Sequence, residues 1–162
     1  MAPPQSISII GAGIGGLTLA RCLLKRNIPI VLYENMPSGT RHSYAITLLQ
    51  SSYQPLLDVP EIDESAFKRR VAVDGTMGGN GAINAKLLVQ QSASSSNSFR
   101  AHRGKLEELL REGLDVRWEH TLERVETIDS HVVLYFQNGQ NGQKVQSDCV
   151  IGLDGIHSNT RK

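Results

Sequence analysis

The sequence contains little cysteine and no excess of charge of either sign. Its 162 residues include two cysteines, Cys22 and Cys149, which are too few for a disulfide framework. Both lie in apolar segments, so we expect small buried side chains in a protein of the reducing cytoplasm. The formal net charge of +1 provides no strong basic field, and we therefore expect no nucleic-acid partner.

Long hydrophobic runs and metal-ligand patterns are also missing. No apolar run approaches the roughly 20 residues of a membrane-spanning helix. The first residues, Met-Ala-Pro-Pro-Gln, lack the charged and apolar regions of a signal peptide. His102, His120, His131 and His157 show no metal-ligand spacing, and no strand-to-elbow serine motif points to a hydrolase. A hydrophobic fraction of 40% over this length predicts one globular domain with a sizeable core.

The first 34 residues contain a strand, a glycine-rich turn, a helix, a second strand and an acid, in that order. We expect an apolar strand at 6–10, an amphipathic helix at 14–26 and an almost continuously apolar strand at 28–33. Asn27 follows the helix at a position that favours a left-handed residue. This order is typical of a Rossmann-like unit, which holds the ADP half of a dinucleotide.

The turn has the pattern GxGxxG, and each glycine has its own reason. Gly11 allows a sharp turn out of the strand, Gly13 lets the backbone approach a pyrophosphate, and Gly16 allows close packing of helix on strand. The helix N-terminus offers N–H groups and a partial positive charge to the phosphates. Glu34, 23 positions after Gly11, can accept a hydrogen bond from a ribose 2′-OH. A glycine turn without a ligand and the NAD site of a dehydrogenase are the alternatives.

The rest of the chain divides into an irregular stretch, 35–100, and a more regular one. In the irregular stretch we expect a strand at 43–49, a helix at 61–70 and loops at 74–84 and 92–98, while two prolines bracket the short segment 55–60. The regular stretch predicts a helix at 103–112 and a strand at 115–120. A three-stranded antiparallel meander is expected at 123–128, 131–137 and 143–146, and a last strand at 149–153. The meander argues against an ordinary NAD-dependent dehydrogenase, in which alternating strands and helices would continue.

Three motifs in this order resemble a known family. They are the GxGxxG turn with Glu34, the segment 103–110 that begins with Arg103, and the segment 150–161 that contains Asp154-Gly155. Together they look like the FAD-dependent aromatic hydroxylases of the para-hydroxybenzoate and salicylate hydroxylase type. The resemblance implies an α/β, Rossmann-like FAD-binding fold over residues 1–162, with 35–100 as a partial excursion toward the substrate. The chain resembles the N-terminal FAD-binding portion only.

The resemblance also implies roles for individual residues. Gly11, Gly13 and Gly16 would approach the FAD pyrophosphate, and Glu34 would hold the adenosine ribose. Backbone would face the cofactor at Ala45 and, near the adenine, at Val125. Arg103 would reach toward the pyrophosphate and the ribityl chain. Asp154 and Gly155 would support FAD and a transient NAD(P)H site, completed by a helix that starts near Ser158.

The family's later Gly-Asp motif, which holds the ribityl chain, is absent from these 162 residues. The family carries out NAD(P)H- and O2-dependent hydroxylation of small aromatic or polyketide-like substrates in a closed pocket. We therefore expect little or no hydroxylation by this chain alone, and exposed apolar surface that favours self-association or a partner chain. The alternative is a non-catalytic nucleotide-binding module that pairs with another chain.

Overall fold

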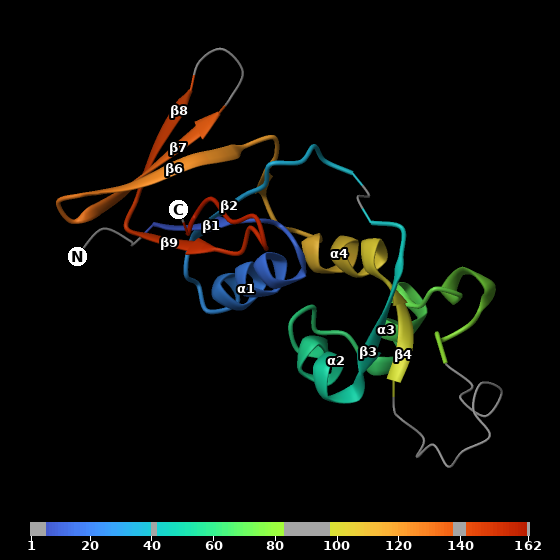
Figure 1. Cartoon of the computed structure of the whole chain (residues 1–162). Helices are drawn as coiled ribbons and strands as arrows, with labels where there is room; N and C mark the ends of the chain where they lie inside the picture. Colours follow the sequence, from blue (N-terminus) through green and yellow to red (C-terminus); the bar gives the residue numbers. More distant parts are fainter. Residues whose placement is uncertain (1–5, 40–41, 83–97, 138–141, 162) are drawn as a thin grey trace. The chain divides into compact units, whose positions relative to one another are not determined.

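The computed structural model describes residues 6–39, 42–82, 98–137 and 142–161 (Figure 1). The chain forms two compact units: the first contains Met1–Gly39 and Gly113–Lys162, and the second contains Thr40–Glu112. Most of the loop expected at 92–98 lies outside the described residues. Among the described helices, none is long and apolar enough to span a membrane.

A parallel sheet forms the centre of the first unit. Its strand order is β5-β2-β1-β9, made by β1 (Ile7–Ile10), β2 (Ile30–Tyr33), β5 (Val116–Arg117) and β9 (Cys149–Gly152). Helix α1 (Ile14–Leu24) connects β1 to β2. Asn27 follows it with a left-handed φ of 58°, as the sequence predicted. The strand, glycine turn, helix and strand are therefore confirmed.

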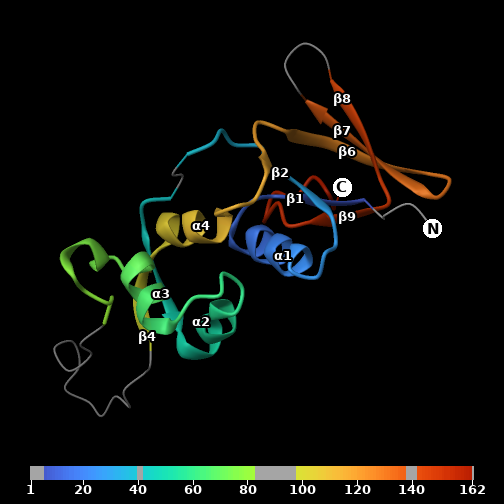
Figure 2. The same cartoon turned by 180° about the vertical axis from the view of Figure 1, so that it is seen from behind.

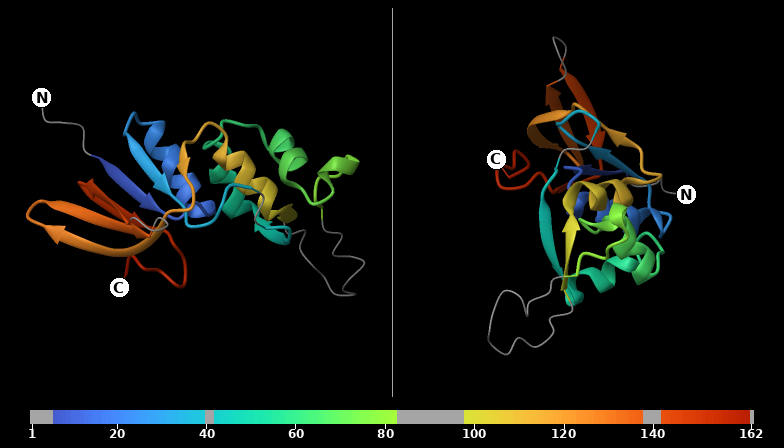
Figure 3. Two further views of the ribbon diagram at one scale, coloured as in Figure 1. Left: turned by 90° about the horizontal axis from the view of Figure 1, so that it is seen from above. Right: turned by 90° about the vertical axis from the view of Figure 1, so that its right-hand side faces the viewer.

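The two faces of this sheet are covered by different elements. The antiparallel meander of β6 (Thr121–Ile128), β7 (His131–Gln137) and β8 (Gln143–Ser147) lies on one face, and α1 lies on the other (Figures 1 and 3). Successive side chains of a strand point to opposite faces. Tyr33 and Ile10 therefore pack with Phe136 of the meander, where the Tyr33 and Phe136 rings stack at 4.6 Å. Ile9, the neighbour of Ile10, lies against the α1 side, close to Gly16.

The second unit joins a two-stranded sheet to short helices (Figure 2). Strands β3 (Ala45–Leu49) and β4 (Ser98–His102) pair in antiparallel fashion. The helices are α2 (Gln50–Leu57), α3 (Glu64–Val71), the 3-10 helix η1 (Gly75–Met77) and α4 (Arg103–Arg111). The core contains the fully buried rings of Tyr53, Phe67 and Phe99, whose centroids lie 5.1 to 6.3 Å apart.

Residues 50–57, for which the sequence predicted no helix or strand, form α2, and Pro55 lies inside it. Two expectations were wrong. Cys149 is exposed because β9 is an outer strand of the described sheet, and Cys22 is only partly buried. Residues 156–161 form turns and bends in place of the helix expected near Ser158. The three-stranded meander and the helix that begins at Arg103 are confirmed.

Candidate functional site

The turn between β1 and α1 is fixed by backbone geometry at Gly11. This residue has a φ of +103°, which side-chain-bearing residues rarely adopt. A Cβ atom built on it would lie 2.4 Å from the carbonyl oxygen of Leu153. The Gly11 N–H donates a hydrogen bond of 2.8 Å to the carbonyl oxygen of Tyr33. Gly11 is therefore required by the packing of the protein itself.

Packing requires glycine at position 16 but not at position 13. A Cβ atom at Gly16 would lie 1.9 Å from the carbonyl oxygen of Gly11, so the close approach of α1 to the turn requires glycine. Gly13, the N-cap of α1, has an ordinary φ of −76°, and a Cβ atom there would meet no atom of the described part of the chain within 4 Å. The N–H groups of the first turn of a helix have no acceptor inside the helix. The protein's own packing thus explains two of the three glycines but leaves Gly13 unexplained.

Glu34 lies at the end of β2, and its carboxylate orders the glycine turn. The residue is only 5% exposed. Its Oε2 accepts a 2.7 Å hydrogen bond from the Ala12 N–H, and its Oε1 accepts a 3.0 Å bond from the Met36 N–H. Glu34 therefore holds the glycine turn in place.

Asp154 lies just beyond β9, beside the same turn. The backbone N–H of Leu153 donates a 2.7 Å hydrogen bond to the carbonyl oxygen of Ile10, which fixes this segment next to Gly11. The Oδ2 atom of Asp154 accepts hydrogen bonds from the Asn159 N–H (2.8 Å), the Thr160 N–H (3.1 Å) and the Thr160 hydroxyl (3.0 Å). These bonds curl residues 154–160 into a turn, where the sequence had predicted a helix.

The other oxygen of Asp154, Oδ1, is buried and has no hydrogen-bond partner among the described residues. Burial raises the pKa of this carboxyl group, but hydrogen bonds from Ser158 and Thr160 outweigh it and the net pKa is lowered. Asp154 is therefore held as a carboxylate next to the glycine turn. The following residue, Gly155, has a φ of +82°, and a Cβ atom there would meet none of the residues described by the structure within 4 Å.

Val125 lies in the middle of β6, an outer strand of the meander. It pairs with Leu134 of β7, and its side chain packs against the core cluster that contains Phe136. Asn159 connects the meander to the Asp154 turn, because its side-chain amide donates a 2.8 Å hydrogen bond to the Leu122 carbonyl oxygen. Only the Val125 backbone remains for the predicted contact with adenine.

The other two predicted residues, Ala45 and Arg103, lie together in the second unit. Ala45 begins β3 and pairs with His102, the residue before Arg103. The Arg103 N–H donates a 3.0 Å hydrogen bond to the Tyr44 carbonyl oxygen. The structure thus divides the nine predicted site residues between the units. Seven are in the first unit (Gly11, Gly13, Gly16, Glu34, Val125, Asp154 and Gly155), and two are in the second.

Two side chains that the sequence reasoning did not identify hold the Arg103 guanidinium group. Glu107 Oε1 accepts a 3.1 Å hydrogen bond from Nε, and the Tyr44 hydroxyl accepts one from a terminal nitrogen. Burial lowers the pKa of Arg103, but these hydrogen bonds outweigh it, so the net pKa is raised and the charge is secure. The spacing of Arg103 and Glu107, four residues apart on a helix, was the available sequence signal.

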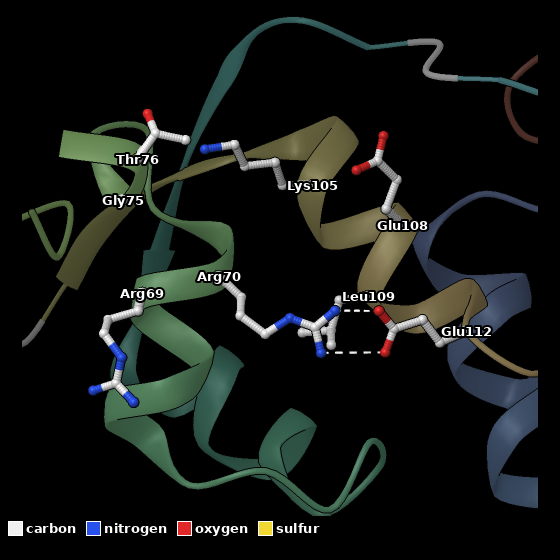
Figure 4. A pocket seen from close by; sticks show the side chains of 8 residues that line it. All are labelled: Arg69, Arg70, Gly75, Thr76, Lys105, Glu108, Leu109 and Glu112. Atoms are coloured by element: carbon white, nitrogen blue, oxygen red, sulfur yellow. Dashed lines mark hydrogen bonds and ion pairs between the residues drawn. The ribbon is translucent and has the colours of Figure 1, made fainter. Parts of the chain in front are cut away.

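The second unit also contains a pocket of about 310 Å³ between α3, η1 and α4 (Figure 4). Its lining includes Arg70, Lys105, Glu108 and Glu112, and none of the predicted site residues lines it. The Arg70 guanidinium points to the Glu112 carboxylate and forms two hydrogen bonds with it. Its charge is therefore balanced within the pocket wall.

Comparison with known proteins agrees with this geometry. Residues 5–162 match the family described as the FAD binding domain. The FAD-dependent monooxygenase nscC of Neosartorya fischeri is 36% identical over 177 residues, and the match covers 99% of this chain and 43% of that protein. The chain therefore spans less than half the length of this curated relative, as the incomplete motif set predicted.

Solved structures confirm the fold. Tetracycline destructase Tet(55) has a TM-score of 0.70 and 24% identity, over 100% of this chain and 41% of its own. The structure of CtdE in complex with FAD has a TM-score of 0.70 and 18% identity, over 97% of this chain and 40% of its own. By sequence and by fold, the chain belongs to the family of FAD-binding domains found in FAD-dependent monooxygenases, and FAD is its cofactor.

Proposed function

We propose that this chain provides the FAD site of a flavin-dependent monooxygenase that uses NAD(P)H and O2 to hydroxylate a small aromatic or polyketide-like molecule. The observation that carries the proposal is Gly13. Its conformation is open to any residue and no atom of the described residues lies within 4 Å of its Cβ position, whereas the glycines at either side of the turn are required by packing. A ligand that approaches the backbone closely is the remaining reason for glycine there.

The other residues of the first unit fit the cofactor in chemical type. The glycine turn and the N-terminus of α1 would take the pyrophosphate, since both offer N–H donors and positive potential. Glu34, which already orders the glycine turn, would accept a hydrogen bond from a ribose hydroxyl. Asp154 has a buried oxygen without a partner among the described residues, as expected of a group that receives a hydrogen bond from a ligand. In the second unit, Ala45 and Arg103 would add a backbone contact and a cation.

We further propose that the chain alone hydroxylates little or nothing. FAD supplies the redox chemistry when bound, accepting electrons from NAD(P)H and passing them to O2. Productive use of this chemistry requires a site closed to water, and the chain spans 43% of the length of its relative nscC. The residues of the chain would then bind and orient the cofactor, and a longer protein or a partner would enclose the substrate.

The proposal is tested by adding FAD to the purified chain, removing the excess and recording a visible spectrum with a fluorescence titration. We expect retained flavin with a dissociation constant in the micromolar range or below. A folded chain that retains no flavin would contradict the proposed site. In the same samples, NAD(P)H and a panel of aromatic substrates should give no coupled product, and substrate-dependent product formation would contradict the second part of the proposal.

A second candidate function, a module that pairs with another chain, is favoured by exposed apolar side chains. In the first unit, Ile156 is 86% exposed and Leu153 is 38% exposed. Exposed apolar surface favours association. Size-exclusion chromatography with light scattering would reveal self-association, and a monomer at high concentration would leave no support for pairing of identical chains.

A further inference from the structure

Glu107 carries a carboxylate in an unusual place, on the buried face of α4. The residue is 5% exposed, and its neighbours Leu106, Leu109 and Leu110 form the core-facing side of the helix. Burial of an unpaired carboxylate is strongly unfavourable, so it must be bound to positive or donor groups. The groups that bind the Glu107 carboxylate therefore explain its buried position.

Its two oxygens hold two different side chains. Oε1 accepts the 3.1 Å hydrogen bond from Arg103 Nε, and Oε2 lies 2.9 Å from Nδ1 of His42. His42 precedes β3, and Arg103 begins α4, so one carboxylate joins two segments that are distant in sequence. The imidazole of His42 also lies edge-on to the Tyr44 ring, with centroids 5.7 Å apart.

Tyr44 completes the enclosure of the arginine. Its hydroxyl accepts a hydrogen bond from a terminal nitrogen of Arg103, and the guanidinium carbon lies 5.4 Å from the centre of its ring. A guanidinium group has five N–H donors. Glu107 and Tyr44 occupy two of them, which leaves three for an acceptor outside the described residues. The side chain is thus fixed at one edge and still able to donate from its terminal nitrogens.

We propose that Glu107 is the positioning residue for FAD in the second unit. It fixes Arg103 in the conformation that presents its terminal N–H groups to an anionic part of the cofactor, with His42 and Tyr44 as supports. This inference rests on the proposed function, in which Arg103 binds FAD. Because the arginine is held before the cofactor arrives, binding does not have to order a long flexible side chain. We expect this preorganisation to change FAD affinity about tenfold.

A double-mutant cycle tests the proposal by FAD fluorescence titration of the full chain. E107Q keeps the shape of the side chain but removes its charge, and R103A removes the group on which Glu107 acts. We expect E107Q to weaken FAD binding about tenfold in the presence of Arg103 and less than twofold in the R103A background. The matched control is E112Q, which removes the carboxylate of the Arg70–Glu112 pair in the pocket of Figure 4 and should leave the affinity within twofold.

A second measurement tests the contact between Glu107 and Arg103 directly and needs no cofactor. In nitrogen-15 NMR spectra of the FAD-free chain, the Arg103 Nε–H should exchange with water at least tenfold more slowly in the wild type than in H42A or E107Q. If the exchange rate is unchanged in both variants, Glu107 does not hold the arginine and the inference is overturned.

The outcomes separate this inference from the proposed function. A wild-type chain that is folded but does not retain FAD overturns the proposed function and this inference with it. A wild-type chain that binds FAD, together with an E107Q effect that is absent or equal in both backgrounds, overturns the inference alone, because Glu107 would then act only on stability. A tenfold effect that disappears in the R103A background supports it.

Discussion

Replacing Gly13 by aspartate should affect stability and cofactor binding in opposite directions. Gly13 is the N-cap of α1, where aspartate is favoured over glycine by a few tenths of a kcal/mol. A carboxylate at a helix N-terminus adds about 0.3–1 kcal/mol. The Glu34 carboxylate, which binds the neighbouring Ala12 N–H, offsets part of this gain. We expect the FAD-free variant to be as stable as the wild type or more stable by up to about 1 kcal/mol, a rise in Tm of at most about 4 °C.

FAD binding should fall steeply in the same variant. If the pyrophosphate lies against this turn, a carboxylate about 4 Å from it adds roughly 4 kcal/mol of repulsion at an effective dielectric constant of 20. This energy corresponds to a loss of affinity of about a thousandfold. G13N has the same shape without the charge and serves as the matched control, with an intermediate loss. Thermal unfolding without FAD and fluorescence titration with FAD measure the two effects.

Two results would refute the reasoning. A G13D chain that binds FAD within threefold of the wild type would show that no phosphate approaches the turn. A G13D chain that is clearly destabilised without FAD would show that packing requires glycine at this position, and Gly13 would then lose its value as a sign of the ligand.

Three further predictions concern stability. The pKa of Asp154 is lowered in the folded state, so its contribution to stability is complete above the unfolded pKa of about 3.9 and is lost as the pH falls through the folded value. D154N should therefore lose less stability than the wild type when the pH is lowered, as measured by urea unfolding. The same loss of stability at low pH in both proteins would contradict the lowered pKa. F136A should lower the free energy of unfolding by about 3–5 kcal/mol, because Phe136 is fully buried between sheet and meander; a loss below 1 kcal/mol in urea unfolding would mean that the meander does not share the core of the sheet. D63A removes the N-cap of α3, where the carboxylate accepts a 2.9 Å hydrogen bond from the Ala66 N–H, and should cost about 1 kcal/mol; D58N, a control at an acid that does not cap this helix, should change thermal stability less than D63A does.

Local patterns in the sequence predicted the first unit well. Gly11 requires a positive φ, Asn27 ends α1 in the left-handed conformation, and alternating side chains identify the strands of the meander. These features depend on residues close together in sequence or on a period of two. The roles of the nine site residues toward FAD remain predictions, since they concern a ligand.

Features that depend on distant residues were missed. Strand β4 pairs with β3 across 49 to 57 positions, and its composition alone gave no strand signal. The contact between His42 and Glu107 joins residues 65 positions apart. The helix expected near Ser158 is replaced by turns and bends at 156–161, where the Asp154 carboxylate accepts hydrogen bonds from the N–H groups of Asn159 and Thr160.

The second unit is an insertion between two neighbouring strands, and this has a consequence for folding. Tyr33 of β2 pairs with Arg117 of β5, and Glu119 donates a hydrogen bond to Met36, so the chain leaves and re-enters the first unit at nearly the same place. Closing this 84-residue separation costs about 2 kcal/mol more than closing a separation one-tenth as long, by the logarithmic dependence of loop entropy on length. A chain in which a short glycine-serine linker replaces residues 40–112 should therefore form the β2–β5 pair more readily, and prior folding of the second unit would give the natural chain the same advantage.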